Sequence, residues 1–334
     1  MTLTRRDTLA LGAAAATASL AAPAIAQSTA TTVGALRFTS HSASFVALER
    51  GYFADEGLDV SFEFFQAAQP MAIAIASGDA DYAVTAISGG LINLAQKNAA
   101  RVIGGALSEE PGIDGQMILA STQSGITAPA GLDGKRWGMT TAGSSFHYVG
   151  SKMAQAEGIE LEYVPLQKVP AVIGALKSGQ VDGWEIVPHI AKPLVGSGAA
   201  TMIGRVSDYL PDYQVTTVFT SEANATGDRP KTEAFLRAFS RGAADFNAAL
   251  VDRTAGEEAA EAMIRLIHGY VYTDREYEAA APSIANGAMR INEGASLNMA
   301  SVEDQLQWFK DEGLIDGGIE MSTLVDDSYV EATA

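Results

Sequence analysis

Four short loops contain the side chains best suited to chemistry in this chain. Each loop follows an apolar segment and precedes a segment of helical periodicity, and most of their residues are small or carry a hydroxyl group. The loops span residues 40–44, 85–88, 140–145 and 184–188. Hydroxyl groups and the free N–H groups at the start of a helix bind acceptors and anions on small molecules. The loops therefore predict a binding site for a small solute, and no residue is assigned a catalytic role.

The candidate ligand-binding residues lie in these loops or close to them. They are Ser40, His41, Ser44, Gln66, Thr85, Ala86, Ser88, Thr141, Ser144, Ser145, Trp184, Glu185, Asp208 and Tyr213. Ser44 and Ser145 are equally well explained as helix N-caps, in which case backbone N–H groups would bind the ligand. Thr141 and Ser144 are stronger candidates, because Gly143 between them lets the backbone approach a ligand closely.

Trp184 and Glu185 end an apolar segment. The ordinary explanation is a partly buried Trp beside a surface Glu. We favour a role in binding, because a carboxylate at a strand end that lines a cleft needs a partner or a donor from the ligand. Asp208 and Tyr213 are expected at the rim of the same cleft.

The four loops contain neither Lys nor Arg. Strongly anionic ligands usually recruit a guanidinium group, so small amides, amino-heterocycles or zwitterions such as taurine fit the loops better than sulfate or phosphate. The chain has four His, none of them spaced i, i+4, and no Cys. We therefore expect no metal site and no cofactor, and we expect His41 and His147 to form hydrogen bonds.

The sequence repeats its turn residues with a constant offset. Glu56-Gly57 recurs 101 residues later as Glu157-Gly158. In each copy a helix ends at Glu-Gly, a strand follows, a second helix ends at Ser-Gly, and a buried strand comes after an Asp. Two similar α/β halves indicate two lobes with a ligand cleft between them. The offset pairs loop 40–44 with 140–145 and loop 85–88 with 184–188, so all four loops should meet in that cleft.

Strands are expected to alternate with helices, which implies parallel pairing and right-handed crossovers. The expected strands are 35–39, 58–65, 82–85, 117–120, 136–140, 161–165 and 183–187, and the expected helices are 44–53, 69–77, 88–98, 145–157, 170–178 and 189–194. The loop at 121–133 is interpreted as the first crossing between lobes, and the return is placed near 215–220. The predicted fold is α/β with two lobes, each a mostly parallel sheet flanked by helices. Lobe 1 would comprise 33–120 plus 218–334, and lobe 2 would comprise 121–217.

The remainder of the chain, from Arg229 onward, has apolar residues at helical spacing. We expect these helices to pack on lobe 1, because a parallel sheet needs cover on both faces. Phe246, Trp308 and Phe309 are expected in the core rather than in contact with a ligand.

Residues 1–26 have the pattern of a cleaved secretory signal that ends in an A-x-A site. Arg5-Arg6 indicates the twin-arginine route, with the Sec route as the alternative. A membrane anchor is disfavoured, because the uncharged stretch is dominated by Ala. Without Cys the chain can carry neither a lipidated cysteine nor a disulfide. We expect a mature protein free in a Gram-negative periplasm.

The charge balance is acidic, with 40 Asp and Glu against 22 Lys and Arg and a net charge of −18. Such a charge repels nucleic-acid phosphates and anionic membrane surfaces. We expect no nucleic-acid partner and a monomeric protein.

Residues 49–60, which read Glu-Arg-Gly-Tyr-Phe-Ala-Asp-Glu-Gly-Leu-Asp-Val, resemble the substrate-binding proteins of ABC importers for nitrate, sulfonates, taurine and thiamin-pyrimidine precursors. Further matches occur at 77–81, 132–136 and 176–182. The resemblance spans roughly residues 33–250 and implies a type II periplasmic-binding-protein fold. It also implies that the lobes close over a ligand and dock on a membrane permease with its ATPase. It does not identify the ligand.

Two functions follow from these patterns. The first is a periplasmic receptor that captures a small organic solute, either sulfonate- or taurine-like or pyrimidine-like, for an ABC importer. The alternative is a periplasmic enzyme on the same scaffold, related to pyrimidine synthases that use histidine and iron. His41 and His147 in paired loops motivate this alternative.

Overall fold

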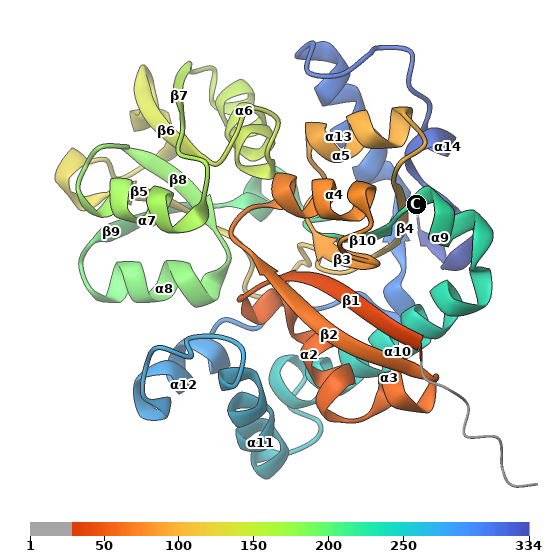
Figure 1. Ribbon diagram of the computed structural model, residues 1–334. Coiled ribbons are helices and arrows are strands. Elements are labelled where there is room, and N and C mark those ends of the chain that lie inside the picture. Colours follow the sequence, from red (N-terminus) through yellow and green to blue (C-terminus); the bar gives the residue numbers. More distant parts are fainter. Residues whose placement is uncertain (1–28, 334) are drawn as a thin grey trace, which may run out of the picture.

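In the computed structural model, which describes residues 29–333, the chain forms two five-stranded sheets (Figure 1). The first sheet has the order β2 (Leu58–Phe65), β1 (Thr29–Leu36), β3 (Tyr82–Thr85), β10 (Thr217–Thr220) and β4 (Arg101–Gly105). The second has the order β7 (Leu161–Pro165), β6 (Lys135–Met139), β8 (Gly183–Ile186), β5 (Met117–Ser121) and β9 (Ala200–Arg205). Helices flank both sheets, which confirms the predicted α/β class.

The two sheets have the same topology. In each, three parallel strands are followed by one antiparallel strand, which is β10 between β3 and β4 in the first lobe and β5 between β8 and β9 in the second. β5 therefore belongs to the second lobe, and the chain crosses between lobes at 106–116 and at 206–216. The expected first crossing at 121–133, and with it the lobe boundary at 120, was wrong. The strand itself was predicted correctly, but its partners are distant in sequence.

Helices follow most strands and cover the sheets. In the first lobe they are α2 (Ser42–Glu49), α3 (Tyr52–Asp55), α4 (Ala68–Ser77) and α5 (Gly89–Gln96). In the second they are α6 (Ser145–Glu157), α7 (Val169–Lys177) and α8 (Pro188–Gly196). The repeated Glu-Gly turns have one physical cause: Gly57 and Gly158 adopt φ of 75° and 68°, the left-handed conformation that ends a helix and favours glycine.

The C-terminal third supplies helices that reach both lobes. It contains α9 (Glu222–Gly227), α10 (Arg229–Phe246), a π-helical turn (Asn247–Val251), α11 (Glu257–His268), α12 (Tyr277–Ala285), α13 (Met299–Asp311) and α14 (Met321–Leu324), with a small sheet of β11 (Leu297–Asn298) and β12 (Ala332–Thr333). α10 packs on α2 and α3, as expected for a cover of the first lobe. α12, however, packs on α8 of the second lobe.

Large aromatic residues anchor this packing. Phe246, Trp308 and Phe309 are buried, which confirms their prediction as core. Trp308 on α13 donates its indole N–H to Ser151 Oγ on α6 at 2.9 Å, so the tail also contacts the second lobe. Between residues 29 and 333 no helix is both long and apolar enough to span a bilayer. The predicted signal segment, 1–26, lies outside the described residues.

Candidate functional site

An inner cavity of about 60 Å³ lies where the carboxyl ends of β1, β3, β6 and β8 meet between the two lobes. The first lobe contributes Ser40 and His41 from one loop and Thr85 and Ala86 from another. The second lobe contributes Thr140, Ser144, Ser145, Ile186 and Val187. All four predicted loops therefore border one cavity, at the edge where open α/β sheets bind ligands.

The lobes touch each other around this cavity. The Gly89 N–H at the start of α5 donates to the Gly143 carbonyl at 2.9 Å, and the Val169 N–H at the start of α7 donates to the Gln66 carbonyl at 3.1 Å. Each bond joins the start of a helix in one lobe to a loop of the other. A solute in the inner cavity would consequently be enclosed by both lobes.

The start of α6 presents unused hydrogen-bonding groups to the cavity. Ser144 is the N-cap residue, but its hydroxyl makes no capping bond and has no partner among the described residues. The N–H groups of Ser145 and Phe146, in the first turn, likewise find no acceptor within residues 29–333. Unpaired polar groups in a buried place are costly, and the two N–H groups can donate to an acceptor on a ligand.

Gln116, the last residue of the first crossing, borders the inner cavity from the hinge side. Its side-chain Nε2 donates to Glu185 Oε2 at 2.8 Å, and its backbone N–H donates to Glu109 Oε1 at 2.8 Å. Its own Oε1 is buried without a partner in the described part of the chain. Gln116 therefore connects the cavity to two buried carboxyl groups.

Glu185 and Glu109 are buried. Burial, together with the charge of Glu109, raises the pKa of Glu185 to about 8. Burial also raises the pKa of Glu109 to about 7, against the bond from the Gln116 N–H and the charge of Arg205. One oxygen of each carboxyl lacks a partner among residues 29–333.

Several predicted residues stand beside the cavity rather than in its lining. Tyr213 is buried at the second crossing, and burial together with the charges of Glu185 and Glu109 raises its pKa well above the usual value. Trp184 is buried with its ring 5.4 Å from Phe146, which borders the cavity. Trp184 and Glu185 therefore contact the lining residues Phe146 and Gln116 from outside the cavity.

The other predicted residues have local roles. Ser88 caps α5 by accepting the Leu91 N–H at 3.2 Å, and the Thr141 carbonyl accepts the Ser144 N–H at 3.1 Å. Ser44 lies inside α2 with its hydroxyl buried and unpartnered among the described residues, so it is not an N-cap. Asp208 is exposed and accepts the Arg205 N–H, away from both cavities, because it closes a short helical turn.

The histidines are arranged differently from the paired-loop expectation. His41 borders the inner cavity and its Nδ1 accepts the Leu36 N–H at 3.3 Å, while burial lowers its pKa to about 3. His147 instead packs against Tyr163 and Trp308, and its Nδ1 accepts the Gly143 N–H at 3.2 Å. His189, which the sequence did not single out, has both ring nitrogens buried without partners in the described chain. Within residues 29–333, no three His, Cys, Asp or Glu side chains form a group suited to a metal ion.

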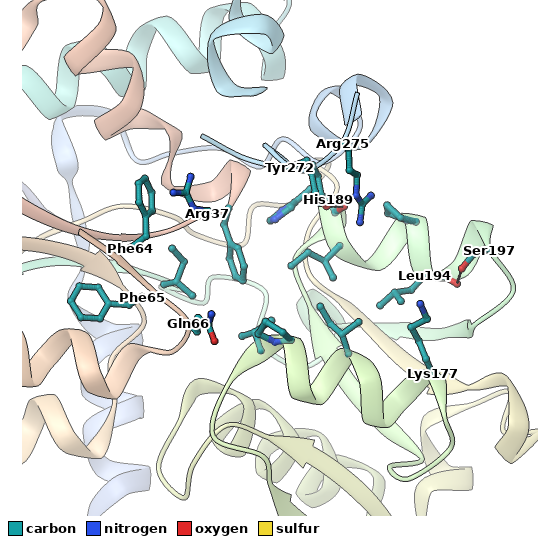
Figure 2. A pocket seen from close by; sticks show the side chains of 17 residues that line it. Arg37, Phe64, Phe65, Gln66, Lys177, His189, Leu194, Ser197, Tyr272 and Arg275 are labelled. Atoms are coloured by element: carbon teal, nitrogen blue, oxygen red, sulfur yellow. Dashed lines mark hydrogen bonds between the residues drawn. The ribbon is translucent and has the colours of Figure 1, made fainter. Parts of the chain in front are cut away.

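A second, outer cavity of about 680 Å³ adjoins the inner one (Figure 2). The two share Leu36, Phe38 and Val169 in their linings. Gln66, a predicted site residue, lines the outer cavity, which extends between β2, α7, α8 and the segment that carries Tyr272.

The outer cavity is cationic. Arg37, Lys177 and Arg275 line it, and no Asp or Glu is among its lining residues. Arg37 lies 3.8 Å from the centre of the Phe64 ring, which also faces this space. The expected lack of Lys and Arg therefore applies to the inner cavity alone. Lys177 and Arg275 come from a helix end and from the tail, where the loop pattern gave no signal.

Comparisons with known proteins agree with this architecture. The family described as NMT1/THI5 like matches residues 38–249, more than half of the chain. The chain belongs to the NMT1/THI5-like family. No curated protein matches it by sequence.

Among solved structures, the alkanesulfonate-binding protein SsuA from Xanthomonas axonopodis pv. citri bound to MOPS has a TM-score of 0.72 at 16% identity, over 90% of this chain and 99% of that one. The periplasmic aliphatic sulphonate-binding protein SsuA from Escherichia coli has a TM-score of 0.68 at 17% identity, over 91% and 94%. The periplasmic nitrate-binding protein NrtA from Synechocystis PCC 6803 has a TM-score of 0.64 at 14% identity, over 89% and 84%. At these identities the similarity shows the fold of periplasmic binding proteins.

Proposed function

We propose that this protein is the periplasmic solute-binding component of an ABC importer and encloses a small organic solute between its lobes. The observation that supports this most directly is the inner cavity, which both lobes border at the carboxyl ends of their strands. Two crossings join the lobes, so a hinge opening there would expose the cavity and a closing motion would bury a bound solute.

The site has two parts with different chemistry. The inner cavity has polar groups without Lys or Arg, and the outer cavity has aromatic rings and three cationic side chains. A solute with a hydrogen-bonding head in the inner cavity and a larger body in the outer one would use both. The candidate solutes are sulfonate- or taurine-like molecules and pyrimidine-like molecules.

Capture rather than catalysis is part of this proposal. The enzyme alternative was motivated by His41 and His147 facing each other. Of these two residues only His41 borders the inner cavity, because His147 packs against Tyr163 and Trp308. The sulfonate- and nitrate-binding names of the structural relatives support a receptor that delivers its solute to a permease and ATPase. We further propose export through the predicted signal at residues 1–26, a monomeric state and no nucleic-acid partner.

The test is a thermal-shift screen with sulfonates, pyrimidines and amino-compounds. A solute at about 100 times its Kd should stabilise the protein by about 2.7 kcal/mol. Ala86→Leu would fill the inner cavity and should abolish the shift, whereas Ala54→Leu, at an exposed position on α3, should preserve it. A screen in which no solute shifts the melting temperature would contradict the receptor function.

A further inference from the structure

The outer cavity carries positive charge in a protein whose net charge is −18. Most Lys and Arg side chains within residues 29–333 form ion pairs with Asp or Glu. Arg37, Lys177 and Arg275 form no such pair with any described residue, and all three line the outer cavity. Asp274, the neighbour of Arg275 in the chain, is not among the lining residues. Cations without a carboxylate partner around one space give it a local positive potential that attracts an anion.

Two of these cations lie on aromatic rings that also line the cavity. Arg37 Cζ is 3.8 Å from the centre of the Phe64 ring, and Arg275 Cζ is 4.4 Å from the centre of the Tyr272 ring. In Figure 2, Arg37 lies on the left of the cavity, and Arg275 and Lys177 lie on the right. A guanidinium group stacked on a ring still has N–H groups at its edge that can bind the oxygens of an anion.

The cations come together because both lobes and the tail meet at this cavity. One of them follows β1, another ends α7, and the third lies between α11 and α12. Arg37 Nη1 donates to the Tyr270 carbonyl at 3.0 Å, and the Tyr272 hydroxyl donates to the His189 carbonyl at 2.6 Å. The tail segment 270–272 is thus bonded to the first lobe and to the second. The positive cavity therefore belongs to the arrangement in which the lobes lie together.

The rest of the wall suits an apolar body the size of a ring. Phe38, Phe64, Phe65 and Tyr272 line the outer cavity, and each is only partly buried, so a solute can contact these rings. Aromatic solutes pack favourably on such rings. The volume of about 680 Å³ lies within the range of about 300–1,000 Å³ that small-molecule sites have, whereas the inner cavity of about 60 Å³ holds only a few atoms.

We propose that the outer cavity binds an aromatic organic anion, such as an arylcarboxylate or an arylsulfonate. The ring of the solute packs on the aromatic wall, and its negative group binds the cations Arg37, Lys177 and Arg275. The inner cavity, which has neither Lys nor Arg in its lining, receives an uncharged end of the solute. This inference rests on the proposed solute-binding function, names the chemical class of the solute and places its charge in the outer cavity.

The experiment compares isosteric probes that differ in charge: benzoate with benzamide, and benzenesulfonate with benzenesulfonamide. Acetate and methanesulfonate present the same charged groups without a ring. Isothermal titration calorimetry on the intact protein at low salt gives the six Kd values. We expect each aromatic anion to bind at least about tenfold more tightly than its neutral isostere, because three partly exposed charge contacts together are worth about that factor. We expect a similar advantage over the aliphatic anions, because these bury no ring.

Variants then assign the preference to residues. Lys177→Gln and Arg275→Gln each remove one charge at an exposed position, so both proteins should fold. Each should weaken the aromatic anions about two- to fivefold and leave the neutral probes unchanged. Lys97→Gln is the matched control, because Lys97 is exposed, forms no ion pair with a described residue and lines neither cavity. It removes the same charge and should change no Kd.

The outcomes separate the two proposals. Neutral probes that bind as tightly as the aromatic anions overturn the inference, and so do aliphatic anions that match the aromatic ones. An unchanged preference in the folded double variant Lys177→Gln/Arg275→Gln also overturns it, as does an equal loss in Lys97→Gln. If solutes from the thermal-shift screen bind while neither aromatic anion does, this inference fails and the receptor function stands. If nothing binds in either experiment, the receptor function itself fails.

Discussion

The two lobes share one topology but differ in the strand that precedes the ligand-binding loop. In the first lobe this strand, β3, contains Ala83 and Val84. In the second lobe the corresponding strand, β8, contains Trp184 and Glu185 at the same offset of 101 residues. All four residues are buried. The same architecture thus tolerates an apolar strand in one lobe and a large aromatic residue with a carboxyl group in the other.

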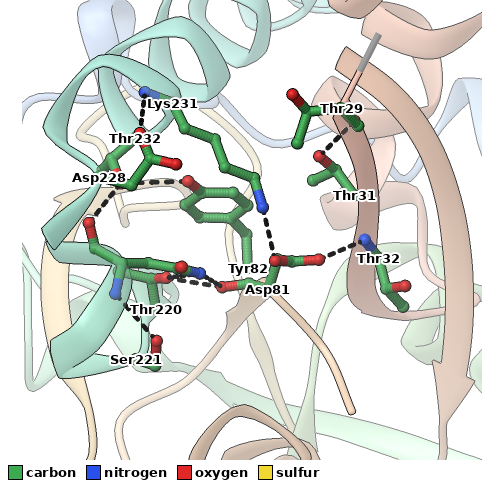
Figure 3. A network of polar contacts seen from close by, with 11 residues as sticks. Thr29, Thr31, Thr32, Asp81, Tyr82, Thr220, Ser221, Asp228, Lys231 and Thr232 are labelled. Atoms are coloured by element: carbon green, nitrogen blue, oxygen red, sulfur yellow. Dashed lines mark hydrogen bonds and ion pairs between the residues drawn. The ribbon is translucent and has the colours of Figure 1, made fainter. Parts of the chain in front are cut away.

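What the lobes share is the anchoring of this strand at its start. Asp81 Oδ2 accepts the Thr32 N–H of β1 at 2.8 Å, and its Oδ1 pairs with Lys231 at 2.6 Å (Figure 3). Asp182 Oδ2 accepts the Arg136 N–H of β6 at 3.0 Å and also pairs with the Arg136 guanidinium. The repeated Asp therefore joins neighbouring parallel strands in both lobes.

The residues that stabilise the sheets and the residues that contact the cavity lining lie at different ends of these strands. The Asp anchors lie at the beginnings of the strands and serve the sheet in both lobes. Trp184 and Glu185 lie nearer the other end, where they support Phe146 and Gln116 at the inner cavity. Of the two lobes, only the second has a carboxyl group at this strand position. We therefore expect the second lobe to distinguish one solute from another.

The largest effect is expected from making β8 resemble β3 at its aromatic position. Trp184→Ala introduces the residue that Ala83 represents in the first lobe, but leaves a large cavity beside Phe146. We expect a loss of roughly 3–5 kcal/mol in the free energy of unfolding. Urea denaturation measures it, with Val84→Ala as the comparison from the first lobe. A smaller loss for Trp184→Ala than for Val84→Ala would contradict the proposed role of Trp184.

An intermediate effect is expected from Glu185→Gln, and it depends on pH. The pKa of Glu185 is about 8 in the folded protein and about 4.3 in an unfolded chain. Between these values only the folded state holds the proton, so stability should fall as pH rises from about 4 to about 8. Glu185→Gln removes this loss, and its stability relative to the unmutated protein should increase over that range.

Urea denaturation at intervals from pH 5 to pH 8 tests the Glu185 prediction. The slope should become shallower in Glu185→Gln without vanishing, because the pKa of Glu109 is also raised, to about 7. Parallel stability curves for the two proteins would show that Glu185 is not buried as a neutral acid.

The smallest effect is expected from Asp182→Asn. Arg136 remains partly exposed and can be solvated, whereas Lys231, the partner of Asp81, is largely buried. Asp81→Asn should therefore cost more, about 1–3 kcal/mol, because it leaves a buried ammonium unpaired.

The pH dependence of Asp182→Asn follows from its ion pair. Bonds from Arg136 lower the pKa of Asp182, so its stabilising contribution is present above about pH 3.9 and is lost as pH falls through the lower, folded value. The stability difference between Asp182→Asn and the unmutated protein should disappear in acid. A difference that persists there would point to packing rather than charge.

Sequence by itself determined the repeated units of this protein. Helix 145–157 and strands 58–65, 82–85 and 161–165 were predicted with the bounds that the structure has. The four loops, and hence Ser40, His41, Thr85, Ala86, Ser144 and Ser145 at one cavity, followed from the offset. These features depend on periodicity, glycine turns and strand-to-helix junctions. Such patterns are local, so they can be recognised in the amino-acid sequence.

Only the tertiary structure decided which distant segments pair. The edge strands β4 and β9 were missed, and each pairs with a single strand that is distant in sequence, β10 for β4 and β5 for β9. β5 was placed in the wrong lobe, because its partners β8 and β9 begin more than 60 residues later. Gln116, His189 and Arg275 reach the two cavities from a crossing, a helix start and the tail. Contacts of this kind depend on how the two lobes are arranged relative to each other. Short-range sequence patterns do not predict that arrangement.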